Sequence, residues 1–222
     1  MSQPASARTW LPIAALLLGA FAIGLGAAFY LRRDAQDVQD AVAIPGLLWP
    51  NPRTTAPFQL LDHDSKPFTD DALRGGWTFM FFGYTACPDA CPTALTVLHH
   101  AMDELTGAKD PAATLPRVVF VSVDPERDTP AGLRGYVQFF DPRFRGVTGT
   151  PAELEQFSRQ FGIAYFKAPL AENSDAYQIE HSLSILLFDP AGRMVALFSA
   201  PHDAKDIARR FRLIQAFIER HS

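Results

Sequence analysis

Cysteine is scarce in this chain, which has only two among its 222 residues. Cys87 and Cys91 are separated by three residues. A disulfide between them would close so short a loop that it would constrain little of the unfolded chain, so an inert structural bond is the weakest explanation for the pair. Two thiolates in one short loop can instead form a reversible redox disulfide or share one soft metal ion.

The chain also lacks an excess of basic residues, since it has 20 Lys and Arg against 24 Asp and Glu, and its formal net charge is -4. No stripe of Arg and Lys alternates with aromatic residues, so nucleic acid is not expected as a partner. The sequence has no internal repeats and no low-complexity tracts. With 48% hydrophobic residues, its length suffices for one substantial domain plus accessory segments.

Charged and strongly polar side chains are absent from residues 10–31. These about 22 residues span roughly 33 Å as a helix, enough to cross a bilayer. Trp10 and Tyr30 stand near the two ends, where interfacial aromatic residues belong. We therefore predict an uncleaved transmembrane anchor at 10–31 behind an N-terminal tail at 1–9, with a buried core helix as the alternative.

The charges that flank this segment do not settle its orientation. Arg8 lies before it, and Arg32 and Arg33 follow it, which leans weakly towards a cytoplasmic C-terminal side. Residues 32–52 are polar at first and then rich in Pro and Ala, without helical or strand periodicity. They predict a linker between the anchor and a domain at 53–222.

Apolar runs and helical periodicities alternate along the predicted domain. A hairpin is expected over 58–68, loops at 107–116 and 169–176, strands at 77–82, 117–123, 164–168, 183–188 and 194–198, and helices beginning near Pro92, Pro130, Pro151 and Asp203. This order predicts an α/β thioredoxin-like fold, with a central mixed sheet flanked by helices and an N-terminal hairpin. The cysteines follow a central strand, where open α/β sheets place their sites.

Two prolines shape the cysteine loop. Pro92 suits the first position of a helix, which would put Cys91 at or near the N-cap. There the unpaired N–H groups and the helix dipole would stabilise a thiolate. The helical spacing also places Cys91 roughly on the leucine side, so its sulfur is expected to be partly sheltered.

His181 is the candidate for a third ligand. It is expected at the head of the strand at 183–188, next to the cysteine loop in a thioredoxin-like fold. Two thiolates and one imidazole form a three-coordinate soft site that suits copper, with zinc as an alternative. By spacing alone, an ordinary polar residue at a strand end is the more common role for a histidine in this position. His99 and His100 are expected to be solvated.

Three blocks together resemble the Sco/SenC family: residues 83–92 (GYTACPDACP), 122–130 (SVDPERDTP) and 177–182 (YQIEHS). Family members are membrane-anchored thioredoxin-like proteins that bind copper and assist assembly of the binuclear copper centre of cytochrome c oxidase. The resemblance implies that Cys87, Cys91 and His181 are the copper ligands. It gives Asp124 and Asp128 a supporting role, with an N-cap and surface charge pairing as the alternative.

The resemblance also implies a single-pass protein of the inner membrane, with its domain in the periplasm. A metallochaperone without catalytic residues is expected, whose partners are the copper-bearing subunit of cytochrome c oxidase and a periplasmic copper donor or thiol reductant. A membrane-anchored thiol-disulfide oxidoreductase, which would keep the acceptor cysteines reduced through a Cys87–Cys91 disulfide, is the alternative. Ala86 departs from the family pattern, because many relatives carry histidine there.

Overall fold

A computed structural model describes residues 10–107, 115–171 and 176–221. The predicted tail at 1–9 and the middle of the two predicted loops at 107–116 and 169–176 lie outside these residues. The chain divides into two compact units, Met1–Ala43 and Ile44–Ser222.

The first unit contains one long helix, α1 (Trp10–Val42). Its segment Leu16–Val42 is long and apolar enough, by length and composition, to cross a membrane. The predicted linker was wrong at its start, because the helix continues to Val42 without a break. No proline or glycine occurs between Arg32 and Ile44, so nothing in the sequence interrupts the helix before Pro45 and Gly46.

The rest of the predicted linker belongs to the second unit. Leu47 forms an antiparallel bridge with Ala196, and the Leu48 N–H donates to the Val195 carbonyl at 2.7 Å. The Trp49 ring packs edge-on against Phe217, with centroids 5.2 Å apart. The domain therefore begins at residue 44 and not at 53, because this segment satisfies backbone groups at a sheet edge and buries an aromatic ring.

Gly46 lies where this segment turns onto the domain, and it gives a test of the packing. Its φ is +79°, and a Cβ there would lie 2.0 Å from the Leu197 carbonyl oxygen. Gly46→Ala is expected to lower the free energy of unfolding by about 2–4 kcal/mol, from left-handed strain and overpacking together. Urea unfolding of the detergent-solubilised chain measures the loss.

The matched control for Gly46 is Gly162→Ala. Gly162 has a similar φ of +71°, but a Cβ there would meet only the end of the Arg53 side chain, at 3.5 Å. The free energy of unfolding of this variant should fall by only about 1–2 kcal/mol, from the left-handed strain alone. Equal losses at the two glycines would show that residues 44–49 do not pack as described.

The second unit is built on an eight-stranded mixed sheet, in the order β1-β10-β9-β4-β5-β6-β2-β3. The strands are β1 (Arg53–Thr54), β2 (Gln59–Asp62), β3 (Pro67–Thr69), β4 (Thr78–Gly83), β5 (Arg117–Ser122), β6 (Arg145–Thr148), β9 (Ile185–Phe188) and β10 (Arg193–Phe198). Strands β4, β5 and β6 are parallel, and β9 is antiparallel to β4. The expected mixed thioredoxin-like sheet and its N-terminal hairpin, β2–β3, are confirmed.

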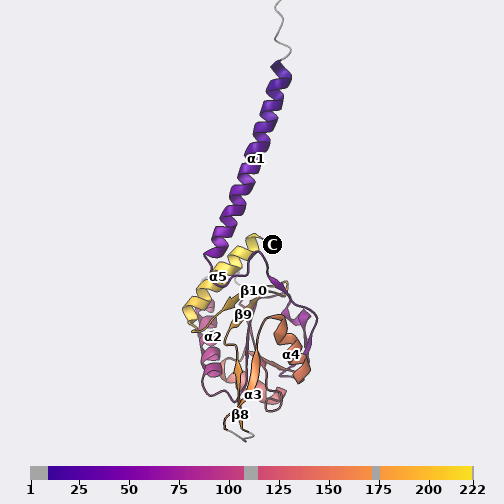
Figure 1. Cartoon of the computed structure of the whole chain (residues 1–222). Coiled ribbons are helices and arrows are strands. Elements are labelled where there is room, and N and C mark those ends of the chain that lie inside the picture. The colour runs from indigo at the N-terminus through magenta and orange to yellow at the C-terminus, as the bar shows by residue number, and fades with distance from the viewer. Residues whose placement is uncertain (1–9, 108–114, 172–175, 222) are drawn as a thin grey trace, which may run out of the picture. The chain divides into compact units, whose positions relative to one another are not determined.

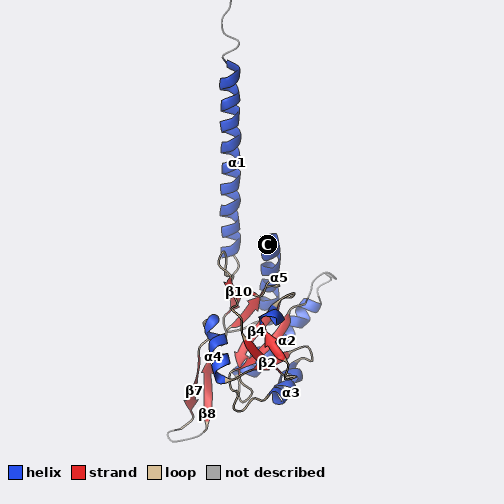
Figure 2. Ribbon diagram, turned by 90° about the vertical axis from the view of Figure 1, so that its right-hand side faces the viewer, coloured by secondary structure: helices blue, strands red, loops and turns tan. Residues whose placement is uncertain are grey.

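Helices cover both faces of this sheet. The helices are α2 (Ala90–Thr106), α3 (Pro130–Phe140), α4 (Pro151–Gln160) and α5 (Ala204–Arg220), with a short 3-10 turn at Asp70–Leu73. Helix α2 lies beside α5 (Figure 1). Figure 2 places α4 on one face of the sheet and α2, α3 and α5 on the other.

Side chains of β4 point alternately to the two helix-covered faces of the sheet, because successive residues of a strand face opposite sides. Phe79 contacts Phe211 of α5, with ring centroids 5.5 Å apart, whereas Phe82 contacts Phe157 of α4 at 5.8 Å. All six residues of β4 are buried. The strand that leads to the cysteines is therefore the centre of the core, which holds its carboxyl end in a fixed position.

The predicted starts of three helices are confirmed by their capping hydrogen bonds. Thr129 accepts from the Gly132 N–H, and Asp203 accepts from the Asp206 N–H. Thr150 and Glu153 form a complete capping box. The sequence did not predict β6 or β8 (Tyr177–His181); β8 pairs with β7 (Tyr165–Pro169) in a separate two-stranded sheet (Figure 2).

Candidate metal centre

The cysteine loop connects the carboxyl end of β4 to α2. The helix begins at Ala90 with Asp89 as its N-cap, so Cys91 is its second residue and Pro92 its third. The predicted start was therefore two residues late. Pro92 is tolerated at this position because the first turn of a helix leaves its N–H groups without partners inside the helix.

His181 reaches the cysteines from a strand that the sequence did not predict. It ends β8, where it pairs with Tyr165 of β7, and β9 begins only at Ile185. The expectation that His181 heads the apolar strand was therefore wrong, but its expected proximity to the cysteine loop is confirmed.

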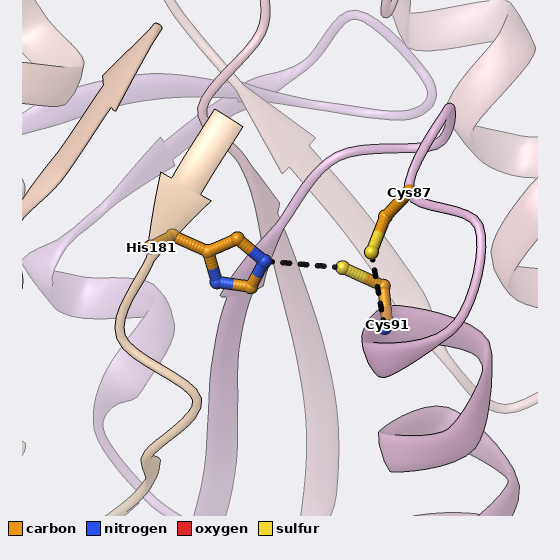
Figure 3. A group of neighbouring side chains, drawn as sticks. All are labelled: Cys87, Cys91 and His181. Atoms are coloured by element: carbon orange, nitrogen blue, oxygen red, sulfur yellow. Dashed lines mark hydrogen bonds between the residues drawn. The ribbon is translucent and has the colours of Figure 1, made fainter. Parts of the chain in front are cut away.

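The three predicted ligands form one cluster (Figure 3). Cys91 Sγ lies 3.4 Å from His181 Nε2. One candidate donor atom from each of Cys87, Cys91 and His181 lies within 4.8 Å of the others. Both cysteines are free thiols, Cys91 fully buried and Cys87 half-buried. The arrangement places two sulfur donors and one nitrogen donor around one point.

Hydrogen bonding selects the tautomer of His181. Its Nδ1–H donates to the Ser182 carbonyl at 3.0 Å, which leaves the Nε2 lone pair directed at Cys91. Burial lowers the pKa of the His181 imidazole. The ring is therefore held neutral and pre-oriented, the form in which histidine binds metals.

The two thiols differ in their surroundings. Burial raises the pKa of the Cys91 thiol well above its usual range. The expectation that the helix start stabilises a Cys91 thiolate was thus wrong, because desolvation outweighs the helix dipole. The Cys91 backbone N–H instead lies 3.4 Å from Cys87 Sγ and donates to it. A soft cation between the sulfurs would supply the positive charge that a Cys91 thiolate requires.

Gly83 makes room for the Cys91 sulfur. A Cβ at this last residue of β4 would lie 2.6 Å from Cys91 Sγ and 2.8 Å from a ring carbon of Phe120. Contacts this short do not occur between real Cβ atoms and their neighbours. The sequence contained Gly83 in the first matched block, but it showed no reason for glycine at this position.

Asp128 holds the cysteine loop to the end of β5. Its carboxylate accepts from the Thr85 N–H at 2.9 Å, from the Thr85 hydroxyl and from the Ser122 hydroxyl. Asp128 is buried, and it is not part of the cluster of candidate ligands. We propose that it fixes the backbone two residues before Cys87, which is a supporting role and not ligation.

Asp124 binds two side chains near the centre, Arg127 and Tyr177. Its carboxylate accepts from the Arg127 guanidinium and, at 2.8 Å, from the Tyr177 hydroxyl of β8. The Arg127 guanidinium lies 3.9 Å from the Tyr177 ring centre and 5.5 Å from that of Tyr84. Arg127 thus connects the strand of His181 to the cysteine loop. No role for Arg127 or Tyr177 is evident from the sequence alone, although both lie in matched blocks.

Arg127→Met tests this connection. The change leaves the fully buried Asp124 carboxylate without its cation, so we expect the free energy of unfolding to fall by about 2 kcal/mol. Arg159→Met removes a comparable ion pair with Glu155, in which both side chains are largely exposed, and should cost less than about 0.5 kcal/mol. Urea titration of the metal-free proteins gives both values, and a loss no larger than that of the control would contradict the connection.

The geometry fits a soft metal ion. A sulfur at about 2.3 Å and a nitrogen at about 2.0 Å from one ion lie about 3.6 Å apart. The separation of Cys91 Sγ and His181 Nε2, 3.4 Å, is close to this value. Two thiolates and one imidazole favour copper, with zinc as the other ion that accepts these donors.

The profile of the SCO1/SenC family matches residues 49–215. The chain belongs to the SCO1/SenC family. Among the curated SCO proteins, mouse mitochondrial SCO2 homolog is 37% identical over 155 residues, which cover 70% of this chain and 60% of the mouse protein. The chain therefore spans less than two thirds of the length of that relative.

Several solved structures of SCO1/SenC relatives contain copper, including those of two ScoI proteins. Arabidopsis thaliana ScoI with copper bound is 33% identical, has a TM-score of 0.66, and is matched over 73% of this chain and 98% of its own. Bradyrhizobium japonicum ScoI with copper bound is 35% identical, has a TM-score of 0.62, and is matched over 74% of this chain and 99% of its own. These relatives confirm the thioredoxin-like fold, and copper is the metal that they bind.

Proposed function

We propose that this SCO1/SenC protein is a metallochaperone that binds copper through Cys87, Cys91 and His181 and delivers it to the binuclear copper centre of cytochrome c oxidase. The observation that carries the proposal is the convergence of two free thiols and a neutral, oriented imidazole within 4.8 Å. The family resemblance and the copper-bound relatives support copper as the cargo.

The difference between the two thiols favours transfer over permanent storage. Cys91 is the most deeply buried of the three donors, whereas Cys87 is half-buried and within reach of an acceptor. An incoming thiolate of the acceptor would replace Cys87 first, followed by Cys91. Copper would then stay bound throughout, and no free ion is needed.

We further propose that residues 10–31 anchor the chain in the inner membrane as a single span and that the domain lies in the periplasm. The apolar candidate span within α1 and the family resemblance support this location. The pair Arg32 and Arg33 weakly favours the opposite orientation, with the domain in the cytoplasm, and the sequence offers no explanation for this pair.

A transfer assay with the detergent-solubilised full chain tests delivery. The protein is loaded with one equivalent of copper and mixed with the reduced copper-binding domain of the oxidase subunit, whose binuclear centre has its own absorption. Appearance of that absorption in proportion to copper lost by this protein is the expected result. Retention of copper by this protein in the presence of excess acceptor would contradict delivery.

Thiol-disulfide exchange is the second candidate, because one thiol is half-buried and the other lies buried beside it, as an attacking and a resolving cysteine would. Cys87 would attack an acceptor disulfide, and Cys91 would then displace the acceptor thiol, which forms a Cys87–Cys91 disulfide and leaves a reduced acceptor. Metal-free protein given oxidised acceptor distinguishes the functions. Reduction without copper transfer in the first assay would favour a reductase.

A further inference from the structure

A second cluster of metal-binding side chains lies on α2, away from the cysteines. His99, His100 and Asp103 each offer one donor atom, and these atoms lie within 4.8 Å of one another. The three residues occupy one turn of the helix, since residues three and four apart are neighbours on a helix surface. His99 is about eight residues, or roughly 12 Å along the helix, from Cys91, so the two clusters are separate.

His99 is oriented by a buried carboxylate. Its Nδ1 lies 3.0 Å from Asp141 Oδ2, and the Asp141 side chain is only 2% exposed. The Arg143 guanidinium donates to both oxygens of this carboxylate, at 2.9 and 2.6 Å. The expectation that His99 is simply solvated was therefore wrong. A carboxylate that accepts from one ring nitrogen commonly fixes a histidine whose other nitrogen binds a metal.

The other nitrogen of His99 faces a second carboxylate. His99 Nε2 lies 3.4 Å from Asp103 Oδ2. If the neutral ring donates its Nδ1 proton to Asp141, Nε2 presents a lone pair to the Asp103 carboxylate, and these two acceptors would need a cation between them. Two donors bound to one tetrahedral ion at about 2.0 Å lie about 3.3 Å apart, which matches the observed separation.

We propose that His99, His100 and Asp103 form a second metal site that takes a borderline divalent cation, such as Zn²⁺. Two imidazoles and one carboxylate suit such an ion, whereas the two sulfurs of the first centre suit copper. The exposed His100 supplies the third donor, and the fourth position faces solvent. Arg143 lies 3.8 Å from the other oxygen of Asp103, but its shorter contact, 2.6 Å, is to Asp141, which offsets its charge.

The competing occupant is a proton. A doubly protonated His99 would bridge Asp103 and Asp141 without any metal and would only tie α2 to the end of α3. The two cases differ in what they bind. A metal site takes up one equivalent of Zn²⁺ through Asp103, and a proton bridge takes up none.

The test uses the full chain in detergent with Cys87→Ser and Cys91→Ser, so that the sulfur site cannot bind the probe. Zn²⁺ is titrated against a chromogenic chelator at neutral pH. We expect one equivalent to bind, with Asp103→Asn weakening the affinity by about tenfold or more. Glu104→Gln, which removes the same charge from the adjacent exposed residue, should leave the affinity unchanged.

No uptake of Zn²⁺, or equal uptake after Asp103→Asn, would overturn the proposal and leave the proton bridge. If circular dichroism shows that the double cysteine variant does not fold, the reduced wild-type chain replaces it. The wild type should then bind two equivalents of Zn²⁺ and its His100→Ala variant one. Equal stoichiometry in these two proteins would likewise reject the site.

Discussion

His181→Ala is expected to weaken the binding of Cu(I) by at least about 100-fold, or roughly 2.8 kcal/mol. The variant loses the donor atom that lies 3.4 Å from Cys91 Sγ and leaves two sulfurs alone around the ion. The fold should be retained, because His181 ends a two-stranded sheet at the periphery and is not one of the buried hydrophobic residues of the core. Competition with a chromogenic Cu(I) chelator measures the affinity.

His63→Gln is the matched control for His181. His63 lies in the turn of the β2–β3 hairpin, where its Nδ1 accepts from the Gly146 N–H. This variant should bind copper with wild-type affinity. Wild-type affinity in the His181→Ala protein would remove His181 from the site, and alanine at Cys87 or Cys91 would then show whether the sulfurs bind copper alone.

Gly83→Ala is expected to damage the copper site without removing any ligand. The new Cβ would lie 2.6 Å from Cys91 Sγ and 2.8 Å from a ring carbon of Phe120. The Cys91 sulfur is fully buried at the start of α2, so the sulfur or the helix must move. We expect a loss of about 1–3 kcal/mol in the free energy of unfolding, together with a loss of copper affinity of about tenfold or more.

Gly76→Ala provides the control, two residues before the start of the same strand. A Cβ there would meet only the Arg117 side chain, at the ordinary contact distance of 3.5 Å. Its copper affinity should equal that of the wild type, measured by the same chelator competition, and its thermal stability should change little. If Gly83→Ala retained both the affinity and the stability of the wild type, the close approach of Cys91 to β4 would be contradicted.

Local sequence patterns predicted most of the second unit. The apolar run of β4, the capping residues Thr129 and Thr150, and the amphipathic stripe of α5 each act over a few residues. They appeared in the structure at or near their expected positions. The error at the start of the domain arose where distant contacts decide the conformation, because residues 44–49 pack against β10 and α5.

For the candidate site, too, some residues could be predicted from the sequence and others could not. The sequence motif identified the two cysteines, and the position of His181 made it a candidate third ligand. The family resemblance supported this set and added the two aspartates. Neither could identify Gly83 or Arg127 as parts of the centre. Gly83 matters because Cys91 and Phe120 approach it from other elements, and Arg127 matters because Tyr177 lies fifty residues away in the chain.

The sequence by itself therefore determined the chemical identity of the candidate donors, two sulfurs in one loop and a histidine far along the chain. It also determined the local elements that carry them. Only the tertiary structure decided that His181 lies against Cys91, because the β7–β8 hairpin brings together residues 90 positions apart. The tertiary structure also decided the proton affinity of Cys91, because burial depends on what the rest of the chain places around the sulfur.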